Sequence, residues 1–307
     1  MAKVAFVFPG QGAHKVGMGK AAHDQTEPGR ATFAAADAAL GEALTTLCFS
    51  GPEETLQLTA NAQPAILTTS IALLRGLAER CDATAGHSLG EYSAHVAAGT
   101  LLFEDAVRLV RKRGQLMQEA VPVGVGAMAA VLGGEVAAIE QACAQTPGVV
   151  EAVNYNCPGQ LVIAGDKAAV DAASALIKEQ GGKVRQLAVS APFHCKLMLP
   201  AEQRFAPELT RTTFHDPQVP VYVNVDAVPV TTLAPARDAL MRQISRPVRW
   251  EQSVRRMLED GVGLFVEIGP GRVLAGMIKR IAKEVPCVNV ESPDDFEAAR
   301  QAIRAQR

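Results

Sequence analysis

Gly86-His87-Ser88-Leu89-Gly90 is the stretch of this chain that says most about its fold, because it fits the pattern GxSxG. In α/β proteins this pattern forms a sharp turn from a strand into a helix and exposes the serine hydroxyl. Glycines flank the serine because the turn leaves no room for side chains. The amides and dipole at the helix N-terminus favour negative charge beside the hydroxyl. A structural Gly-rich turn is the alternative interpretation of so short a pattern.

The segments around this turn predict an α/β fold. Residues 81–85 are expected to form the strand before the turn, and residues 91–98 the helix after it. Residues 4–8 form an apolar strand ended by Pro9 and Gly10. Further strands are expected at 219–223 and 264–268, and further helices at 64–80 (with Pro64 in its first turn), 104–119, 234–244, 251–259 and 273–283. This alternation predicts a parallel sheet covered by helices, in an α/β-hydrolase-like large subdomain.

A different rhythm between residues 126 and 191 predicts a small inserted subdomain. Strands are expected at 127–132, 149–154, 161–164 and 184–189, and helices at 136–144 and 168–178. The order βαββαβ with short connections is typical of a ferredoxin-like unit. We therefore expect residues 1–125 and 192–307 to form the large subdomain, with residues 126–191 inserted into it.

Composition excludes several classes of protein. The 307 residues carry a net charge of −2, whereas a dedicated nucleic-acid-binding protein has a clear basic excess. The six cysteines include no CxxC pair, so neither a zinc site nor a disulfide framework is indicated. Free thiols are typical of a reducing compartment, and no apolar run approaches the length of a membrane span. We expect a cytoplasmic protein that binds neither nucleic acid nor membrane.

His194 is the best candidate for the base that a catalytic serine needs. His87 adjoins Ser88 and is expected to point away from it, and His95 lies two turns into the following helix. The others stand in polar loop or helix-edge settings: His14, His23 and His215. His194 follows the inserted unit, where the chain returns to the main sheet, and active sites tend to lie at such junctions. Cys195 is expected to point to the opposite side and to be structural.

Several short blocks spread from residue 8 to residue 271 carry a family resemblance. They are Phe8-Pro9-Gly10-Gln11-Gly12, Gly86-His87-Ser88-Leu89-Gly90-Glu91-Tyr92-Ser93, Arg113-Gly114 with Met117-Gln118, Asn154-Tyr155-Asn156-Cys157-Pro158-Gly159-Gln160, Phe193-His194, Pro247-Val248-Arg249-Trp250 and Gly269-Pro270-Gly271. In this order they resemble the malonyl-CoA:acyl carrier protein transacylases of fatty acid and polyketide synthesis. The fold of that family also contains a ferredoxin-like insertion.

The resemblance implies a role for each catalytic position. Ser88 is the nucleophile and His194 its base. The backbone amides of Gln11 and Leu89 stabilise the oxyanion of the tetrahedral intermediate. The backbone carbonyl of Arg249 holds the second nitrogen of His194, so no acidic residue is needed for a Ser–His pair.

The resemblance also implies how substrate is selected. Arg113 matches the arginine that pairs with the free carboxylate of malonyl, a task that suits a planar guanidinium. Phe193 and Met117 are expected to line the same pocket, with core filling as the alternative for each. Gln63 and Asn156 are also expected to bind substrate. The neighbours of Arg113 are expected to form a solvated basic face: Arg108, Arg111 and Lys112.

The implied reaction moves malonyl from malonyl-CoA to the phosphopantetheine thiol of acyl carrier protein, through a malonyl-Ser88 ester. No metal and no permanently bound cofactor are expected, and the protein is expected to be a monomer. Candidate docking residues for an acidic carrier protein are Arg111, Lys112, Lys183, Arg185, Lys279, Arg280 and Lys283. A serine hydrolase that uses water and a non-catalytic interaction module are the alternatives.

Overall fold

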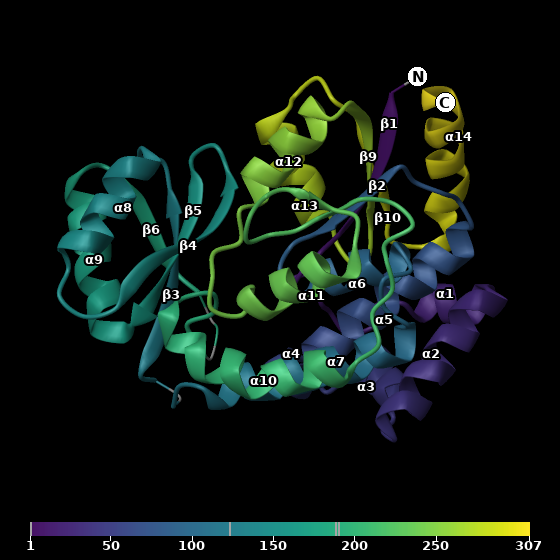
Figure 1. The fold of residues 1–307 in the computed structure, drawn as a ribbon, viewed down its shortest axis with the longest axis horizontal. Coiled ribbons are helices and arrows are strands. Elements are labelled where there is room, and N and C mark those ends of the chain that lie inside the picture. Colours follow the sequence, from purple (N-terminus) through teal and green to yellow (C-terminus); the bar gives the residue numbers. More distant parts are fainter. Residues whose placement is uncertain (1, 123, 188, 190) are drawn as a thin grey trace.

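The computed structural model describes residues 2–122, 124–187, 189 and 191–307 and arranges them around two sheets (Figure 1). The strands of the larger sheet run in the order β10 (Cys287–Val290), β9 (Val262–Ile268), β1 (Lys3–Phe8), β2 (Ala83–Gly86), β7 (Val221–Tyr222) and β8 (Pro229–Val230). Neighbouring strands are parallel except β7 and β8, which are antiparallel. The sheet therefore confirms the predicted α/β class. Strands β8 and β10 were not predicted.

The helices of the large subdomain cover both faces of this sheet. They are α1 (Lys20–Gln25), α2 (Glu27–Leu40), α3 (Leu44–Ser50), α4 (Glu53–Gln57), α5 (Thr59–Leu77), α6 (Gly90–Ala97), α7 (Phe103–Glu119), α10 (Leu199–Arg211), α11 (Leu233–Arg242), α12 (Trp250–Glu259), α13 (Val273–Ile281) and α14 (Phe296–Gln306). Because side chains alternate along a strand, β1 contributes to two cores. Val4 and Phe6 belong to the core with α5, α6, α7 and α14, whereas Ala5 and Val7 belong to the core with α12 and α13.

The register of the central strands places two loops side by side. Phe8 at the end of β1 pairs with Gly86 at the end of β2. The backbone amide of His87 continues this contact by donating to the carbonyl of Phe8 at 3.1 Å. The loop that contains Gln11 and the turn that contains Ser88 therefore leave the sheet at the same edge, as expected where parallel strands end together.

The smaller sheet confirms the βαββαβ prediction. Its elements are β3 (Gly126–Leu132), α8 (Val136–Gln145), β4 (Val150–Cys157), β5 (Gln160–Asp166), α9 (Lys167–Glu179) and β6 (Lys183–Gln186). The strands are antiparallel in the order β4-β5-β3-β6, which is the ferredoxin-like arrangement. The predicted last strand ran to residue 189, and residue 188 lies outside the described residues.

Strand β4 also connects the small subdomain to the large one. The backbone amide of Tyr155 donates to the carbonyl of Val248 at 2.9 Å, and the amide of Val248 donates to the carbonyl of Val153 at 2.8 Å. Figure 1 shows the small subdomain to one side of the large one, with α10, α11 and α12 beside it. Within the described residues, no helix is both long and apolar enough to cross a membrane.

The start of helix α5 differs from the prediction. The helix begins at Thr59, so Pro64 lies inside it rather than in its first turn. A proline in this position cannot donate to the carbonyl four residues earlier, which is that of Ala60. The guanidinium of Arg111 donates to this carbonyl instead, at 2.9 Å. Arg111 is only 9 % exposed and also pairs with Glu42 at 2.7 Å, so its placement on a solvated face was wrong.

Candidate active site

The turn between β2 and α6 has the strained geometry predicted from its glycines. Ser88 adopts a φ of 51°, a left-handed conformation that non-glycine residues rarely adopt. A Cβ on Gly86 would lie 1.9 Å from the backbone carbon of Gly90, and a Cβ on Gly90 would lie 2.0 Å from the carbonyl oxygen of Phe8. Only glycine fits at these two positions, and the close packing presents the Ser88 hydroxyl beside the N-terminus of α6.

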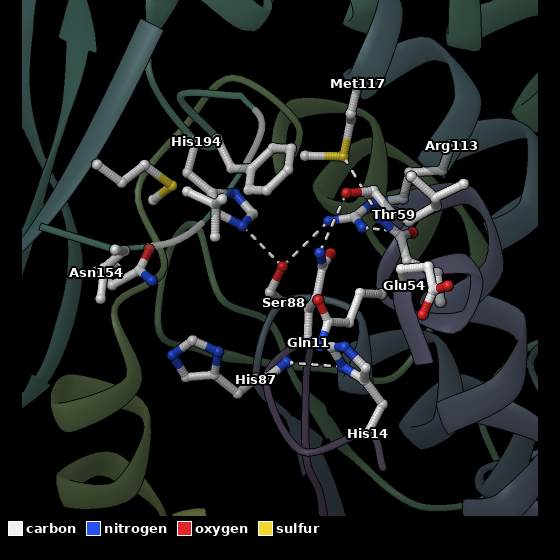
Figure 2. A pocket seen from close by; sticks show the side chains of 18 residues that line it. Gln11, His14, Glu54, Thr59, His87, Ser88, Arg113, Met117, Asn154 and His194 are labelled. Carbon is white, nitrogen blue, oxygen red and sulfur yellow. Dashed lines mark hydrogen bonds between the residues drawn. The ribbon is translucent and has the colours of Figure 1, made fainter. Parts of the chain in front are cut away.

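The structure brings His194 to Ser88, although 106 residues separate them. The Nε2 atom of His194 lies 2.7 Å from the Oγ atom of Ser88 (Figure 2). The Nδ1 atom lies 2.8 Å from the backbone carbonyl oxygen of Gln243. Because a carbonyl only accepts, Nδ1 carries the proton and Nε2 is the acceptor for the Ser88 hydroxyl.

The prediction that Arg249 supplies the carbonyl to His194 is wrong. Arg249 directly precedes α12, and its carbonyl accepts from the amide of Ser253 in the first turn of that helix at 2.9 Å. Gln243 follows the last residue of α11, where carbonyl groups have no amide of their own helix to accept from. A helix C-terminus is therefore the natural source of this acceptor.

The surroundings of His194 keep it neutral. Burial lowers the pKa of its imidazole to about 3, and the positive charge of Arg113 acts in the same direction. A neutral imidazole can accept the serine proton. The arrangement can therefore act as a nucleophile and general base without an acidic third member.

Arg113 lies beside the same hydroxyl and is almost fully buried, with 1 % of its surface exposed. Its Nη2 atom donates to Ser88 Oγ at 3.2 Å and to Gln243 Oε1 at 3.0 Å, and its Nη1 atom donates to Gln63 Oε1 at 2.7 Å. Figure 2 shows the guanidinium and the imidazole approaching Ser88 from different sides. Arg113 thus places a positive charge where a short acyl chain on Ser88 would end.

These side chains open into a cavity of about 650 Å³ between the two subdomains. The predicted site residues that line it are Gln11, Gln63, Ser88, Arg113, Met117, Phe193 and His194. The small subdomain contributes Met128 and Asn154 to its wall. His14 and Glu54 also line the cavity (Figure 2), and no sequence pattern predicted them as cavity residues.

The two predicted oxyanion donors lie on the adjoining loops. Gln11 follows β1, and its side chain is fixed by a hydrogen bond from Nε2 to Thr59 Oγ1 at 3.1 Å. Leu89 directly precedes α6. In the described part of the chain, neither backbone amide donates a hydrogen bond to another protein group. Both amides are therefore available to a ligand oxygen.

Asn156 is not placed as predicted. It does not line the cavity, and its Oδ1 atom lies 2.9 Å from Nε2 of His87. The pairing of β4 with β5 is irregular between Ala152 and Asn154 and again between Tyr155 and Cys157. This irregularity disturbs the simple alternation of faces, so Asn154 reaches the cavity and Asn156 ties the small subdomain to the Ser88 turn.

Sequence reasoning missed two amide side chains that hold the turn. Asn224 accepts from the Ser88 amide at Oδ1, at 2.7 Å, and donates from Nδ2 to the Gly86 carbonyl, also at 2.7 Å. Gln243 donates from Nε2 to the Ser88 carbonyl at 2.9 Å. Neither residue lies in a recognisable motif. The predicted end of a helix at residue 244 could have pointed to Gln243, because carbonyl groups at a helix end have no donor within the helix.

Cys195 does not compete with Ser88 as a nucleophile. Its Sγ atom donates to the carbonyl of Pro192 at 3.1 Å, and burial raises the pKa of the thiol to about 12. Among the described residues, no cluster of three or more His, Cys, Asp or Glu side chains has an arrangement suited to a metal ion.

Comparison with known proteins identifies the family of this chain. The acyl transferase domain family matches residues 5–300. The malonyl CoA-acyl carrier protein transacylase of Bacillus subtilis (strain 168) is 45% identical over 313 residues, covering 100% of this chain and 99% of the relative.

Two solved structures extend the comparison to the fold. An acyl carrier protein S-malonyltransferase from Vibrio cholerae has a TM-score of 0.95 at 46% identity, covering 97% of this chain and 100% of that chain. A malonyl-transacylase solved with its type II PKS acyl-carrier protein has a TM-score of 0.95 at 43% identity, covering 98% and 100%. The chain therefore belongs to the acyl transferase domain family, among the malonyl CoA-acyl carrier protein transacylases.

Proposed function

We propose that this protein transfers malonyl from malonyl-CoA to the phosphopantetheine thiol of an acyl carrier protein, through an ester on Ser88. The single observation that carries the proposal is that Ser88 Oγ lies within hydrogen-bond distance of both His194 and Arg113. The first contact activates the hydroxyl. The second places a cation where the free carboxylate of a malonyl group on that oxygen would lie. The product supplies extender units for fatty acid or polyketide synthesis.

The first half-reaction forms the malonyl ester. Ser88 Oγ attacks the thioester carbonyl while its proton passes to Nε2 of His194. The amides of Gln11 and Leu89 stabilise the oxyanion. As the C–S bond breaks, the imidazolium returns the proton to the departing thiolate of coenzyme A. The carbonyl of Gln243 stabilises the imidazolium through Nδ1.

The second half-reaction repeats these steps in reverse with the thiol of the carrier protein. His194 takes the proton of the thiol, the sulfur attacks the ester carbonyl, and Ser88 leaves with the proton returned. Phosphopantetheine thus arrives on the partner and is not a resident cofactor. The cavity between the subdomains is open to such an arm.

Arg113 selects the acyl group. Malonyl carries one methylene between its thioester carbon and its carboxylate, and a bidentate contact with the guanidinium recognises that carboxylate. Met117, Phe193 and Gln63 form the wall around it. Acetyl would offer the buried guanidinium no carboxylate for direct contact, at a cost of roughly 2–5 kcal/mol. That corresponds to a preference of roughly tens to thousands of fold.

The test is intact-mass analysis of the protein after mixing with malonyl-CoA or acetyl-CoA. Wild type is expected to gain a malonyl adduct, and Ser88→Ala none. Arg113→Ala is expected to lose malonyl loading by roughly tens to thousands of fold and to gain some acetyl loading. A malonyl adduct that persists in Ser88→Ala, or Arg113→Ala that loads malonyl like wild type, contradicts the proposal.

The carrier protein is expected to be acidic and to dock transiently near the cavity. Arg111 is excluded as a docking residue because its guanidinium is buried against Ala60 and Glu42. Arg280 donates to the carbonyl of Pro158 at 2.7 Å. The remaining candidates are Lys112, Lys183, Arg185, Lys279, Arg280 and Lys283, and docking that is indifferent to salt contradicts this steering role.

A further inference from the structure

A buried carboxyl group lies beneath the site and has no part in the steps above. Glu91, in the first turn of α6, has no exposed surface. Burying an ionised carboxylate is costly unless a positive charge balances it. The contacts of Glu91 therefore indicate which positive charge balances its carboxylate, and that charge is Arg113.

The two oxygen atoms of Glu91 have different surroundings. Oε2 accepts from the backbone amide of Asn224 at 2.8 Å and from Nε2 of Gln243 at 2.9 Å. Oε1 has no hydrogen-bond partner in the described part of the chain, and Nε2 of His95 lies 4.0 Å away. Oε1 is therefore a position where a proton can be added without displacing a donor.

The amide of Gln243 connects this carboxyl to the substrate-binding arginine. Its Nε2 atom donates to Glu91, and its Oε1 atom accepts from Nη2 of Arg113 at 3.0 Å. These two contacts fix the orientation of the Gln243 amide, because its nitrogen faces the Glu91 carboxylate and its oxygen faces the Arg113 guanidinium. Glu91 and Arg113 are thus an ion pair bridged by one amide group.

Among the described residues, Arg113 is the only positively charged group that interacts with Glu91. On its own helix, burial lowers the pKa of His95 to about 3 and raises that of Tyr92, so both are neutral. From the loop after β7, Asp226 faces Glu91 and is itself paired with Arg242 at 2.6 Å. The described residues of α5, β1 and β2 make no charged contact with it, and from α7 only Arg113 does.

We propose that Glu91 is the counter-charge of Arg113 in the unloaded site and takes up a proton on Oε1 when a malonyl carboxylate binds Arg113. The proposal rests on the proposed function, since it requires malonyl in the site. The proton comes from solvent, and the buried cluster then holds one cation and one anion both before and after loading. Oε2 keeps both of its donors throughout.

The charge state of the empty site supports this exchange. Burial raises the pKa of Glu91 to about 7, and the amide donors and Arg113 oppose that rise. A malonyl carboxylate draws on the same Arg113 and adds a second negative charge, which raises the pKa of Glu91 further. Above the pKa of the empty site, loading therefore consumes a proton, whereas well below that pKa Glu91 is already protonated and loading consumes none.

The test is the pH dependence of the loading equilibrium between the enzyme with malonyl-CoA and the malonyl-enzyme with coenzyme A. Intact-mass analysis measures this constant from about pH 6 to about pH 8.5, the window around the pKa of Glu91. In wild type the constant is expected to fall as pH rises above about 7, by up to about tenfold per pH unit. In Glu91→Gln, which mimics the protonated acid, it is expected to show no such fall.

The comparison of wild type with Glu91→Gln cancels the contribution of other titrating groups to the pH dependence. The coenzyme A thiol, for example, ionises equally in both experiments. Glu54→Gln is the matched control, since Glu54 is a carboxyl at the cavity wall and is not among the contacts of Arg113 in the described part of the chain. This control is expected to keep the wild-type slope. Equal slopes in wild type and Glu91→Gln overturn the proposal.

A second measurement does not depend on Glu91→Gln folding. The heat of loading of wild type at about pH 7.5 is compared in phosphate and in Tris, whose ionisation enthalpies differ, so the difference counts the protons taken up. Uptake of a substantial fraction of one proton is expected, and zero uptake overturns the inference. If wild type forms no adduct on Ser88 at any pH, the proposed function fails instead, so the two failures are distinguishable.

Discussion

At the residue scale, one oxygen atom organises the site. Ser88 Oγ donates to His194 at 2.7 Å and accepts from Arg113 at 3.2 Å. Both Ser88 and His194 have positive φ, at 51° and 65°. Such conformations are unfavourable for residues with a Cβ and persist only where the surroundings impose them. The strain at both members of the pair indicates that the fold holds them for chemistry rather than for stability.

The sequence was sufficient to predict Ser88, His194 and Arg113, which the structure brings together, but not the residues that hold them in place. Ser88 lies in a motif with its own local geometry, and His194 was found by its place after the inserted unit. Gln243 acts through its backbone carbonyl and side-chain amide, and neither has a sequence signature. The carbonyl was therefore assigned to Arg249, six positions away. A backbone contact depends on where a helix ends, and helix ends are the least certain part of a sequence prediction.

At the scale of helices and strands, the elements with a clear hydrophobic pattern were predictable. Very short strands, and a helix with a proline inside it, were not. The βαββαβ unit follows from its alternation, and β1 follows from a run of apolar residues. Strand β8 has only two residues, which is too short for a hydrophobic pattern. The start of α5 was predicted too late because Pro64 was taken to mark it. A proline normally marks a helix start, and here Arg111, which lies 51 residues after Ala60, donates to the carbonyl that Pro64 leaves without its helical donor.

Arg111→Met is therefore expected to destabilise the protein by about 1–3 kcal/mol, because the buried carbonyl of Ala60 loses its donor. Arg108→Met is the matched control on the same helix, since Arg108 is exposed and, among the described residues, its only ion pair is with Asp105 of its own helix. Its effect is expected to stay within about 0.5 kcal/mol. Urea unfolding of both variants measures the difference, and equal losses contradict the role of Arg111 in α5.

At the scale of the whole molecule, buried ionisable groups link stability to pH. His95 is fully buried, and neither of its ring nitrogens makes a hydrogen bond in the described part of the chain. Burial lowers its pKa from the ordinary value of 6.5 to about 3. Between these values the unfolded chain binds a proton that the folded protein does not, so stability falls as pH falls through that window.

Replacing His95 removes this contribution. Relative to wild type, His95→Leu is expected to gain up to about 1.4 kcal/mol of stability for each pH unit below about 6.5. Unfolding free energies at several pH values between about 4.5 and 7.5 measure the change. His215→Gln, at an exposed position, is expected to follow the wild-type curve. A difference between His95→Leu and wild type that does not vary with pH rules out the linkage.

The site is built by both subdomains. The cavity is walled by Ser88 and Arg113 from the large subdomain and by Met128 and Asn154 from the small one. The small subdomain is fixed to the large one through Val248 and through the contact between His87 and Asn156. The site therefore lies between two subdomains that hydrogen bonds hold together.

The most direct test of malonyl transfer follows the malonyl-Ser88 enzyme after free malonyl-CoA is removed. Mass spectrometry records the loss of the adduct with and without acyl carrier protein that bears phosphopantetheine. The adduct is expected to move to the carrier thiol much faster than it is lost to water. Loss at the same rate in both samples, with free malonate as the product, would identify a hydrolase and contradict the account.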